Sequence, residues 1–467
     1  MRTADFARCV ASLAVAVGFV SCADNPTLPD PDPDPEFLGS TIAPGPVNVL
    51  SAVVTVTATG FETAALRMRT PGEPDMVSPP YAFDGRESRP AALGLLPETT
   101  YEIDVLVTAD GETQLGEMHS FTTDALPAWV PTITPVGSPS VEGYVVLSHP
   151  PGAIIIDNQG RVRWYVGDPD GPIFGFLTSF MAHPNGEYTL NGLNDQLRVH
   201  RAINELGEEV RLLACVGRET RFHEIRVLAD GGYWVGCENP VPTDLSSRGG
   251  NADGEVIWTV FQHVGPDGSL EFEFNTADHF SLDDIDQDVF VGVSQVNITH
   301  GNAIDFDTDG NLLFSWRSLN EVTKVDAVTG EVIWRLGGNA STLTVVDDTR
   351  AFERPHGLRA VGPGLVQLLD NGSVAPSRLV RYAVDEQAMT ATRVLEFVTE
   401  EGSYTSTGGS TEVVGTDHAL VSFGTVGKVV EVNAAGVETF DLTGVEGTYI
   451  FRASRISSLY AAERAGD

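Results

Sequence analysis

Apolar and polar residues alternate along residues 40–125, and four runs do so strictly enough to predict β-strands. The runs are VVTVTAT (53–59), AALRMRT (64–70), YEIDVLVT (101–108) and EMHSFTT (117–123). A period of two places every second side chain on the same face, so each run has one buried side. The alternation predicts a β-sandwich. No cluster of ionisable residues falls in this stretch, which indicates a spacer or docking module rather than a catalytic unit.

A turn-forming segment that ends in a tyrosine precedes the third run. The segment LPETTY (96–101) resembles the fibronectin type III pattern, in which a tyrosine corner fixes a loop to the sandwich. The resemblance implies a fibronectin type III or immunoglobulin-like β-sandwich over residues 40–125.

A weak repeat recurs over residues 126–467. Its copies are IIIDNQGRVRWYV (154–166), NADGEVIWTV (251–260), VDAVTGEVIWRLGG (325–338) and VEVNAAGVETFDL (430–442). Each joins an apolar strand to a second strand through a turn that contains glycine. Short strands of this kind without a helical period predict an all-β fold, a β-propeller of six blades at roughly 50–60 residues per blade. A β-helix is the alternative, but its rungs would repeat more regularly.

The net charge of the chain excludes some classes of binding partner. The chain carries 28 basic and 65 acidic residues, a formal net charge of −37. Such a chain repels nucleic acid, so we expect no nucleic-acid partner, and an anionic substrate would need a local cationic site.

The first 22 residues have the features of an export signal. Arg2 and Arg8 precede an apolar run over residues 10–20, which ends in FVSC at Cys22. This resembles a bacterial lipoprotein signal with Cys22 as the lipidated residue; secretion with cleavage nearby is the alternative. Residues 23–39 are a Pro/Asp-rich linker, which indicates an extended tether between the membrane and the folded part. We expect an exported lipoprotein, periplasmic or at the cell surface, in the outer rather than the inner membrane.

Cysteine usage agrees with export. Cys9 lies in the signal, which leaves Cys215 and Cys237 as an even pair in an oxidising compartment. The pair predicts a disulfide, and two buried thiols on different strands are the alternative.

Three histidines share a context that predicts a common site. His223 (RFHEIRVL), His300 (ITHGNAIDF) and His356 (ERPHGLRAV) each precede an apolar stretch. In a propeller the innermost strands line one channel, so residues that enter them from successive blades converge at one mouth. Arg317 follows the strand after His300. The alternative is that each histidine is simply satisfied inside the channel.

No metal site is predicted. The three histidines form no His-x-His or His-Glu-x-x-His pair, and an arginine beside a metal would repel it. Asp305, Asp307, Asp309 and Gly310 begin like a calcium loop, but Trp316 stands where such a loop needs glutamate. These residues predict a strand turn instead, and the acidic run over 283–288 predicts a solvated loop; a bound calcium ion is the alternative.

A resemblance to a known family then joins these residues. The stretch 300–338 resembles the bacterial arylsulfate sulfotransferases, with their His-x-Asn, Ser-x-Arg, Lys-x-Asp and Trp-x-Leu-Gly-Gly motifs. Here these are His300/Asn302, Ser315/Arg317, Lys324/Asp326 and Trp334/Leu336/Gly337/Gly338, and the match continues with Phe352, LLDNGS (368–373) and TYIFRASRISSLY (448–460).

The resemblance implies roles for individual residues. His356 corresponds to the family's sulfated nucleophile, His223 and His300 to two further essential histidines, and Arg317 to the essential arginine. Asn302 belongs to the His300 motif and supports it. Pro355 departs from the family, which usually has glutamine before the nucleophile.

The implied activity is transfer of a sulfuryl group from an aryl sulfate to a phenolic acceptor, without cofactor, metal or nucleotide. A neutral imidazole attacks sulfur, an arginine binds the sulfuryl oxygens and a second histidine moves the proton. Two alternatives stay open: a hydrolase that uses water, and a degenerate propeller that binds a ligand or a protein on its tether. A homodimer also stays open.

Replacing Cys22 tests the anchor. If lipid on this cysteine is the anchor, Cys22→Ser leaves the protein soluble and active, because no predicted channel residue lies nearby. Fractionation of membranes and soluble extract measures this. A variant that still sediments with membranes would show that the anchor lies elsewhere.

Overall fold

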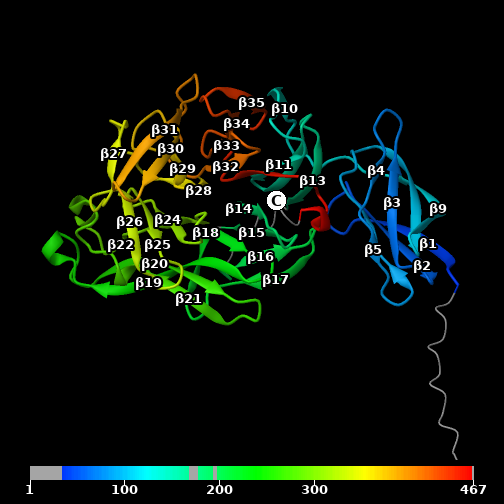
Figure 1. Cartoon of the computed structure of the whole chain (residues 1–467), viewed down its shortest axis with the longest axis horizontal. Helices are drawn as coiled ribbons and strands as arrows, with labels where there is room; N and C mark the ends of the chain where they lie inside the picture. The colour runs from blue at the N-terminus through cyan, green and yellow to red at the C-terminus, as the bar shows by residue number, and fades with distance from the viewer. Residues whose placement is uncertain (1–33, 168–176, 193–196, 465–467) are drawn as a thin grey trace, which may run out of the picture.

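The computed structural model describes residues 34–167, 177–192 and 197–464 (Figure 1). The signal, Cys22 and most of the 23–39 linker lie outside these residues. The described part is nearly all-β, and it contains no helix long and apolar enough to cross a membrane.

Two sheets form the N-terminal unit, at the right of Figure 1. The first consists of β1 (Glu36–Pro44), β2 (Ala52–Thr59), β6 (Glu87–Ser88) and β7 (Ala91–Ala92). The second consists of β3 (Thr63–Arg69), β4 (Met76–Val77), β5 (Tyr81–Ala82), β8 (Thr100–Ala109) and β9 (Glu112–Thr122). The alternating residues of β2, β3 and β8 fill one core between the sheets.

Two element boundaries differ from the sequence prediction. β1 begins at Glu36, ahead of the predicted boundary at residue 40, because Phe37 already packs against the core. β9 begins at Glu112 rather than at residue 117, because Asp110 and Gly111 form a two-residue turn that pairs β8 with β9 at once. Both turn residues have positive φ (50° and 75°), which is typical of Asp-Gly hairpins.

Tyr101 makes the contact that a tyrosine corner requires. Its side chain is buried, and the N–H of Leu96 donates a hydrogen bond of 2.9 Å to its hydroxyl oxygen. The loop before β8 is thereby fixed to the core.

Six further sheets follow in the described part of the chain, and they form a β-propeller-like ring. The first has β36 (Ala453–Ile456), β11 (Tyr144–His149), β12 (Gly152–Asp157) and β13 (Val162–Gly167). The second has β14 (Leu177–Ala182), β15 (Tyr188–Gly192), β16 (His200–Ile203) and β17 (Glu209–Leu213). The third has β18 (Glu219–Val227), β19 (Tyr233–Thr243), β20 (Gly254–Val264), β21 (Leu270–Asn275) and β22 (Gln295–Asn297).

The remaining three sheets complete the ring. The fourth has β23 (Gly301–Phe306), β24 (Leu312–Trp316), β25 (Glu321–Val325) and β26 (Val332–Gly337). The fifth has β28 (His356–Gly362), β29 (Leu365–Asp370), β30 (Arg378–Asp385), β31 (Thr390–Phe397) and β27 (Thr344–Val346). The sixth has β32 (Ser410–Val414), β33 (His418–Phe423), β34 (Lys428–Val432), β35 (Glu438–Thr443) and β10 (Thr134–Gly137).

Strands from both ends of the ring segment close it. β10 pairs with β35, and β36 pairs with β11, so two neighbouring sheets each combine early and late residues. Strands of neighbouring sheets contact one another in turn around the centre: β14 contacts β18, β18 contacts β23, β23 contacts β28, β28 contacts β32, and β32 contacts β36. This order brings β18, β23 and β28 side by side.

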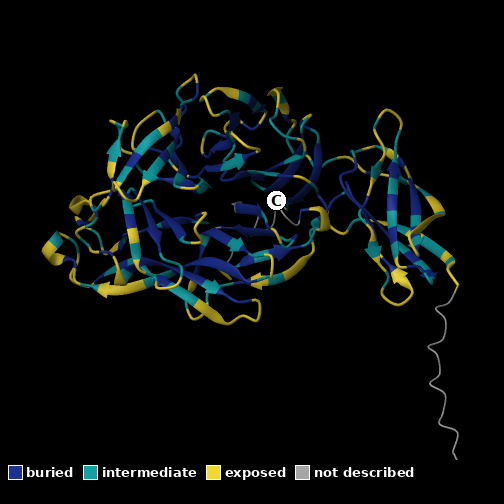
Figure 2. Ribbon diagram, in the orientation of Figure 1, coloured by how far each residue is buried: buried dark blue, intermediate teal, exposed yellow. Residues whose placement is uncertain are grey.

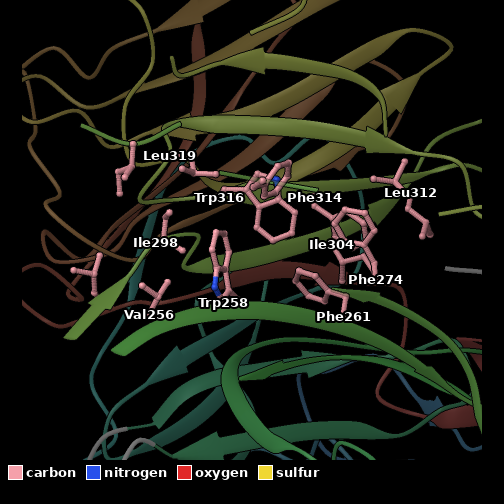
Figure 3. Packing of buried hydrophobic residues seen from close by; sticks show 14 of the residues in the cluster. Val256, Trp258, Phe261, Phe274, Ile298, Ile304, Leu312, Phe314, Trp316 and Leu319 are labelled. Atoms are coloured by element: carbon pink, nitrogen blue, oxygen red, sulfur yellow. The ribbon is translucent and has the colours of Figure 1, made fainter. Parts of the chain in front are cut away.

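The strands of the ring consist largely of buried residues (Figure 2). Their apolar side chains form clusters that join neighbouring sheets. Figure 3 shows the largest cluster, where Trp258 and Phe261 of β20 meet Phe314 and Trp316 of β24. Phe261 and Phe314 stack with their ring centroids 4.7 Å apart. This packing fixes β24, and therefore the loop that follows it.

The N-terminal unit is docked on the ring. The hydroxyl group of Tyr460 accepts from Leu93 N–H and donates to the carbonyl oxygen of Ala91, each at 3.2 Å. The hydroxyl of Tyr81 donates to Glu205 at 2.6 Å. These buried or half-buried contacts hold the unit against the ring.

Removing the indole of Trp316 tests the packing between the third and fourth sheets. Trp316→Ala leaves a cavity among aromatic rings, and we expect it to lower the free energy of unfolding by about 3–5 kcal/mol. Urea unfolding followed by circular dichroism measures the loss. Val328→Ala, at a position with 89% exposure, is the control and should change stability by less than about 0.5 kcal/mol. Equal losses in both variants would contradict the packing argument.

Candidate functional site

The three predicted histidines lie together at one end of the central strands. His223 is in β18, His300 immediately precedes β23, and His356 begins β28. His223 Nε2 and His300 Nε2 are 3.1 Å apart, a hydrogen bond in which one ring donates to the other. The ring of Phe451 lies 6.3 Å from His223 and 6.4 Å from His356, centroid to centroid.

Backbone contacts join Arg317 to His300. His300 adopts a positive φ of 47°, which its N–H supports by donating to Asn297 Oδ1 at 2.9 Å. The N–H of Arg317 donates to the carbonyl oxygen of His300 at 3.1 Å. The half-buried Arg317 guanidinium is close enough that its charge helps to lower the pKa of both His300 and His356.

His356 has its tautomer fixed by its neighbours. Its Nδ1 lies 2.6 Å from Asn371 Oδ1 and 3.1 Å from the carbonyl oxygen of Arg354. The Asn371 amide is oriented because its Nδ2 donates to the carbonyl oxygens of Thr405 and Gly408. Both partners of Nδ1 are therefore acceptors, so Nδ1 carries the proton and Nε2 carries the lone pair.

The site keeps all three imidazoles neutral. Burial lowers the pKa of His356 to about 4, and the charges of Arg317 and Arg452 act in the same direction. Burial, aided by Arg221, also lowers the pKa of His223 and His300 well below the ordinary value. At neutral pH each ring is therefore available as a base or nucleophile.

Asn302 connects the segments that carry His300 and His356. Its Oδ1 accepts from Ser315 Oγ at 2.6 Å, and its Nδ2 donates to the carbonyl oxygen of Pro355 at 2.9 Å. Pro355 thus presents its carbonyl to this contact. The Asn302 amide thereby fixes the backbone before His356.

Three site residues carried no role in the sequence analysis. Arg221 is buried two positions before His223, and its Nε has no hydrogen-bond partner among the described residues. Arg452 Nη2 donates to the carbonyl oxygen of His223 at 3.0 Å. Arg452 and Asn371 lie in the motifs TYIFRASRISSLY and LLDNGS, which carried the family resemblance, whereas Arg221 had no signal beyond its spacing from His223.

The aspartates of the calcium-like loop surround a lysine. Lys324 Nζ lies 2.7 Å from Asp307, 2.6 Å from Asp309 and 2.7 Å from Glu386. An ammonium group therefore stands at the centre of this carboxylate cluster. Asp305 belongs to a different contact, because it pairs with Arg226 at 3.0 Å.

Cys215 and Cys237 are joined in a disulfide. The bond ties the segment before β18 to β19, where Thr220 and Cys237 are register partners. It thereby fixes the start of the strand that carries Arg221 and His223.

Comparison with known proteins gives one family. The model described as arylsulfotransferase (ASST) matches residues 217–444, a span that includes the three histidines and Arg317. No curated protein matches the chain.

Solved structures resemble the chain at low identity. A protein of unknown function from Bacteroides caccae is 13% identical with a TM-score of 0.43, covering 67% of this chain and 98% of that one. Virginiamycin B lyase from Staphylococcus aureus is 12% identical with a TM-score of 0.36, covering 74% and 92%. A periplasmic gluconolactonase from Pseudomonas aeruginosa is 13% identical with a TM-score of 0.39, covering 68% and 100%.

The tautomer of His356 can be measured directly. ¹⁵N NMR of histidine-labelled protein should show a protonated Nδ1 and an unprotonated Nε2 from pH 8 down to about pH 5, because the pKa of this ring is about 4. In Asn371→Ala the ring should populate both tautomers, since Nδ1 loses its stronger acceptor. A wild-type ring that protonates near the ordinary value of 6.5 would contradict the burial argument.

Proposed function

The chain belongs to the arylsulfotransferase family through residues 217–444, and from this premise we propose that it transfers a sulfuryl group from an aryl sulfate to a phenol through a sulfohistidine at His356. The observation that carries the proposal is the fixed tautomer of this ring. Asn371 and Arg354 hold the proton on Nδ1, which leaves the Nε2 lone pair as nucleophile beside a guanidinium and two further neutral histidines.

The first half-reaction uses the lone pair of His356. Nε2 forms a bond to sulfur in line with the departing phenolate, and the sulfur–oxygen bond breaks with its electron pair on the phenolate oxygen. Positive charge develops on the ring, and the Nδ1–H hydrogen bond to Asn371 stabilises it. Arg317 binds the sulfuryl oxygens with its planar guanidinium.

The histidine pair handles the proton. His223 and His300 share a hydrogen bond of 3.1 Å, and burial, reinforced by nearby arginine charges, holds their pKa values well below the ordinary value in the free protein. A bound sulfate monoester offsets those arginine charges, so the proton affinity of the pair rises and the pair takes up one proton from solvent when the donor binds. The pair then protonates the leaving phenolate, and in the second half-reaction it accepts the proton of the incoming phenol as that oxygen attacks sulfur and the nitrogen–sulfur bond breaks.

The architecture fits a tethered enzyme of this family. In this proposal the six sheets of the ring are the six blades of the family's propeller, and the N-terminal unit is a fibronectin type III-like spacer. Lipid on Cys22 and the Pro/Asp-rich linker would then hold the enzyme at a bacterial membrane outside the cytoplasm. The three neutral histidines, the arginines and Asn371 supply the groups that the chemistry needs, without a cofactor or metal.

A chromogenic assay tests the function. Purified protein is mixed with 4-nitrophenyl sulfate, with and without phenol. Release of nitrophenolate that requires phenol is the expected result. Release without phenol would indicate a hydrolase, and no release with a range of aryl sulfates would indicate a binding module; either outcome overturns the proposal.

Withholding the acceptor should trap the intermediate. Intact-mass analysis after donor treatment should show an adduct of about 80 Da, one sulfuryl group, that disappears when phenol is added. His356→Ala should lose both the adduct and the transfer activity. Peptide mapping locates the group, and an adduct that persists in His356→Ala would identify a different nucleophile, with His300 the next candidate.

Substitutions of the neighbouring residues should separate charge from geometry. Arg317→Lys keeps a cation but loses the planar fork, so we expect adduct formation to slow by the equivalent of roughly 2–4 kcal/mol. Arg86→Lys on the exposed surface is the matched control.

His223→Ala or His300→Ala should slow transfer from donors with poor leaving groups more than transfer from 4-nitrophenyl sulfate, because a good leaving group needs less protonation. An equal loss of transfer rate with every donor would contradict a role of the two histidines in proton transfer.

A further inference from the structure

A cavity lies inside the ring among residues of β14, β18, β28, β32 and β36, and none of the three site histidines lines it. Its volume is about 170 Å³, and its charged lining consists of Arg226, Arg359, Arg452, Arg455, Arg464 and Glu412. This is far more room than the roughly 10–15 Å³ that one water needs. Five arginines around one cavity contrast with the net charge of −37 of the chain.

The cavity and the histidines occupy different levels of the same strands. Arg226 follows His223 by three residues in β18, and Arg359 follows His356 by three residues in β28. At about 3.3 Å per residue, this separation is about 10 Å along each strand. Glu224 lies between these two levels, and three of the five arginines of the cavity contact it.

Carboxylates compensate only part of this charge. Arg452, Arg359 and Arg226 approach the same carboxylate of Glu224 at 2.6, 3.3 and 3.4 Å. Arg226 also pairs with Asp305, and Arg455 pairs with Glu431. The single negative charge of Glu224 is therefore shared among three guanidinium groups.

Glu412 contributes less negative charge than its type suggests. It accepts from the N–H of Arg455 at 2.7 Å, and burial raises its pKa to about 7 although Arg359 and Arg226 oppose the shift. At neutral pH this carboxyl group is therefore only partly ionised.

Arg464 is the residue that points to a ligand. It is only 1% exposed, its Nη2 donates to the carbonyl oxygen of Gly186, and its guanidinium lies 4.1 Å from the centre of the Tyr188 ring. Its Nε and Nη1 have no hydrogen-bond partner, and no carboxylate pairs with it, among residues 34–167, 177–192 and 197–464. Burying an uncompensated cation is costly, and a bound anion removes that cost.

We propose that this cavity binds a small tetrahedral oxyanion, such as sulfate or phosphate, at Arg464 and the neighbouring arginines. Guanidinium groups present paired N–H donors that match the oxygens of such an anion. The ligand would bridge Arg464 to the arginines of β18, β28 and β36. Because β36 and the C-terminal segment close the ring, the bound anion stabilises that closure. The site does not depend on the proposed transferase activity.

Calorimetric titration and thermal unfolding of the full chain test the proposal. Sodium sulfate and sodium phosphate are compared with sodium chloride at equal ionic strength. Saturable binding of at least one oxyanion, with a rise in Tm of roughly 3 °C near saturation, is expected. No response beyond that of chloride overturns the proposal, and the two arms decide which oxyanion is preferred.

Four variants locate the anion. Arg464→Gln should weaken binding at least tenfold, whereas Arg317→Gln in the histidine site and Arg86→Gln on the surface should leave the affinity unchanged. Loss of binding in Arg317→Gln instead would place the anion at the histidine site and overturn the proposal. Glu412→Gln removes a negative group from the cavity and should tighten binding several-fold. If Arg464→Gln does not fold, an unchanged affinity in Glu412→Gln overturns the proposal by itself.

Discussion

The carboxylate of Glu224 connects the strands on which the site is built. It is buried in β18, next to His223, and it contacts Arg452 before β36 and Arg359 in β28. These partners keep its pKa below the ordinary value despite burial. Because Arg452 also binds the carbonyl oxygen of His223, one ionic cluster sets the relative positions of His223, His356 and the strand that closes the ring. Buried ionic groups of this kind contribute more to the choice of one arrangement than to net stability.

Guanidinium charges also act on the histidines of the site, where Arg221, Arg317 and Arg452 add to the effect of burial on the pKa values. Three neutral imidazoles could be kept neutral by burial alone, but here guanidinium charges reinforce the effect and also attract an anion. In the proposed reaction, the same guanidinium charges would keep the nucleophile neutral and bind the anionic substrate. Because the chain carries a net charge of −37, the arginines around the histidines would be the favoured place for the anionic donor of the proposed reaction.

Much of the fold was accessible from the sequence because strand alternation and glycine turns are local signals. The repeats at 154–166 and 325–338 correspond to the observed pairs β12–β13 and β25–β26. The family recognition is confirmed by the match over residues 217–444. The early start of β9 was missed, although the Asp-Gly turn before it is itself a local signal.

The site was harder to predict because its remaining members are distant in sequence. Asn371 fixes His356 across 15 positions, whereas Arg452 reaches His223 across 229. The sequence distance from either residue to its histidine indicates no role, because the folded ring alone brings the two residues of each contact together. The histidines could be found because all three occur in a similar sequence context. Arg452, which donates to a backbone carbonyl oxygen, occurs in no such repeated context.

Closure by β36 also has a consequence for the order of events during synthesis. The last strand follows Arg452 and pairs with β11, more than 300 residues earlier in the chain. A nascent chain that has emerged only through β28 can form the hairpins of the earlier sheets and carries all three histidines, yet it lacks the arginine that supports His223. The histidines therefore gain the support of Arg452 only after synthesis has passed residue 452, and a chain that stops before this residue would carry every histidine of the site without that support.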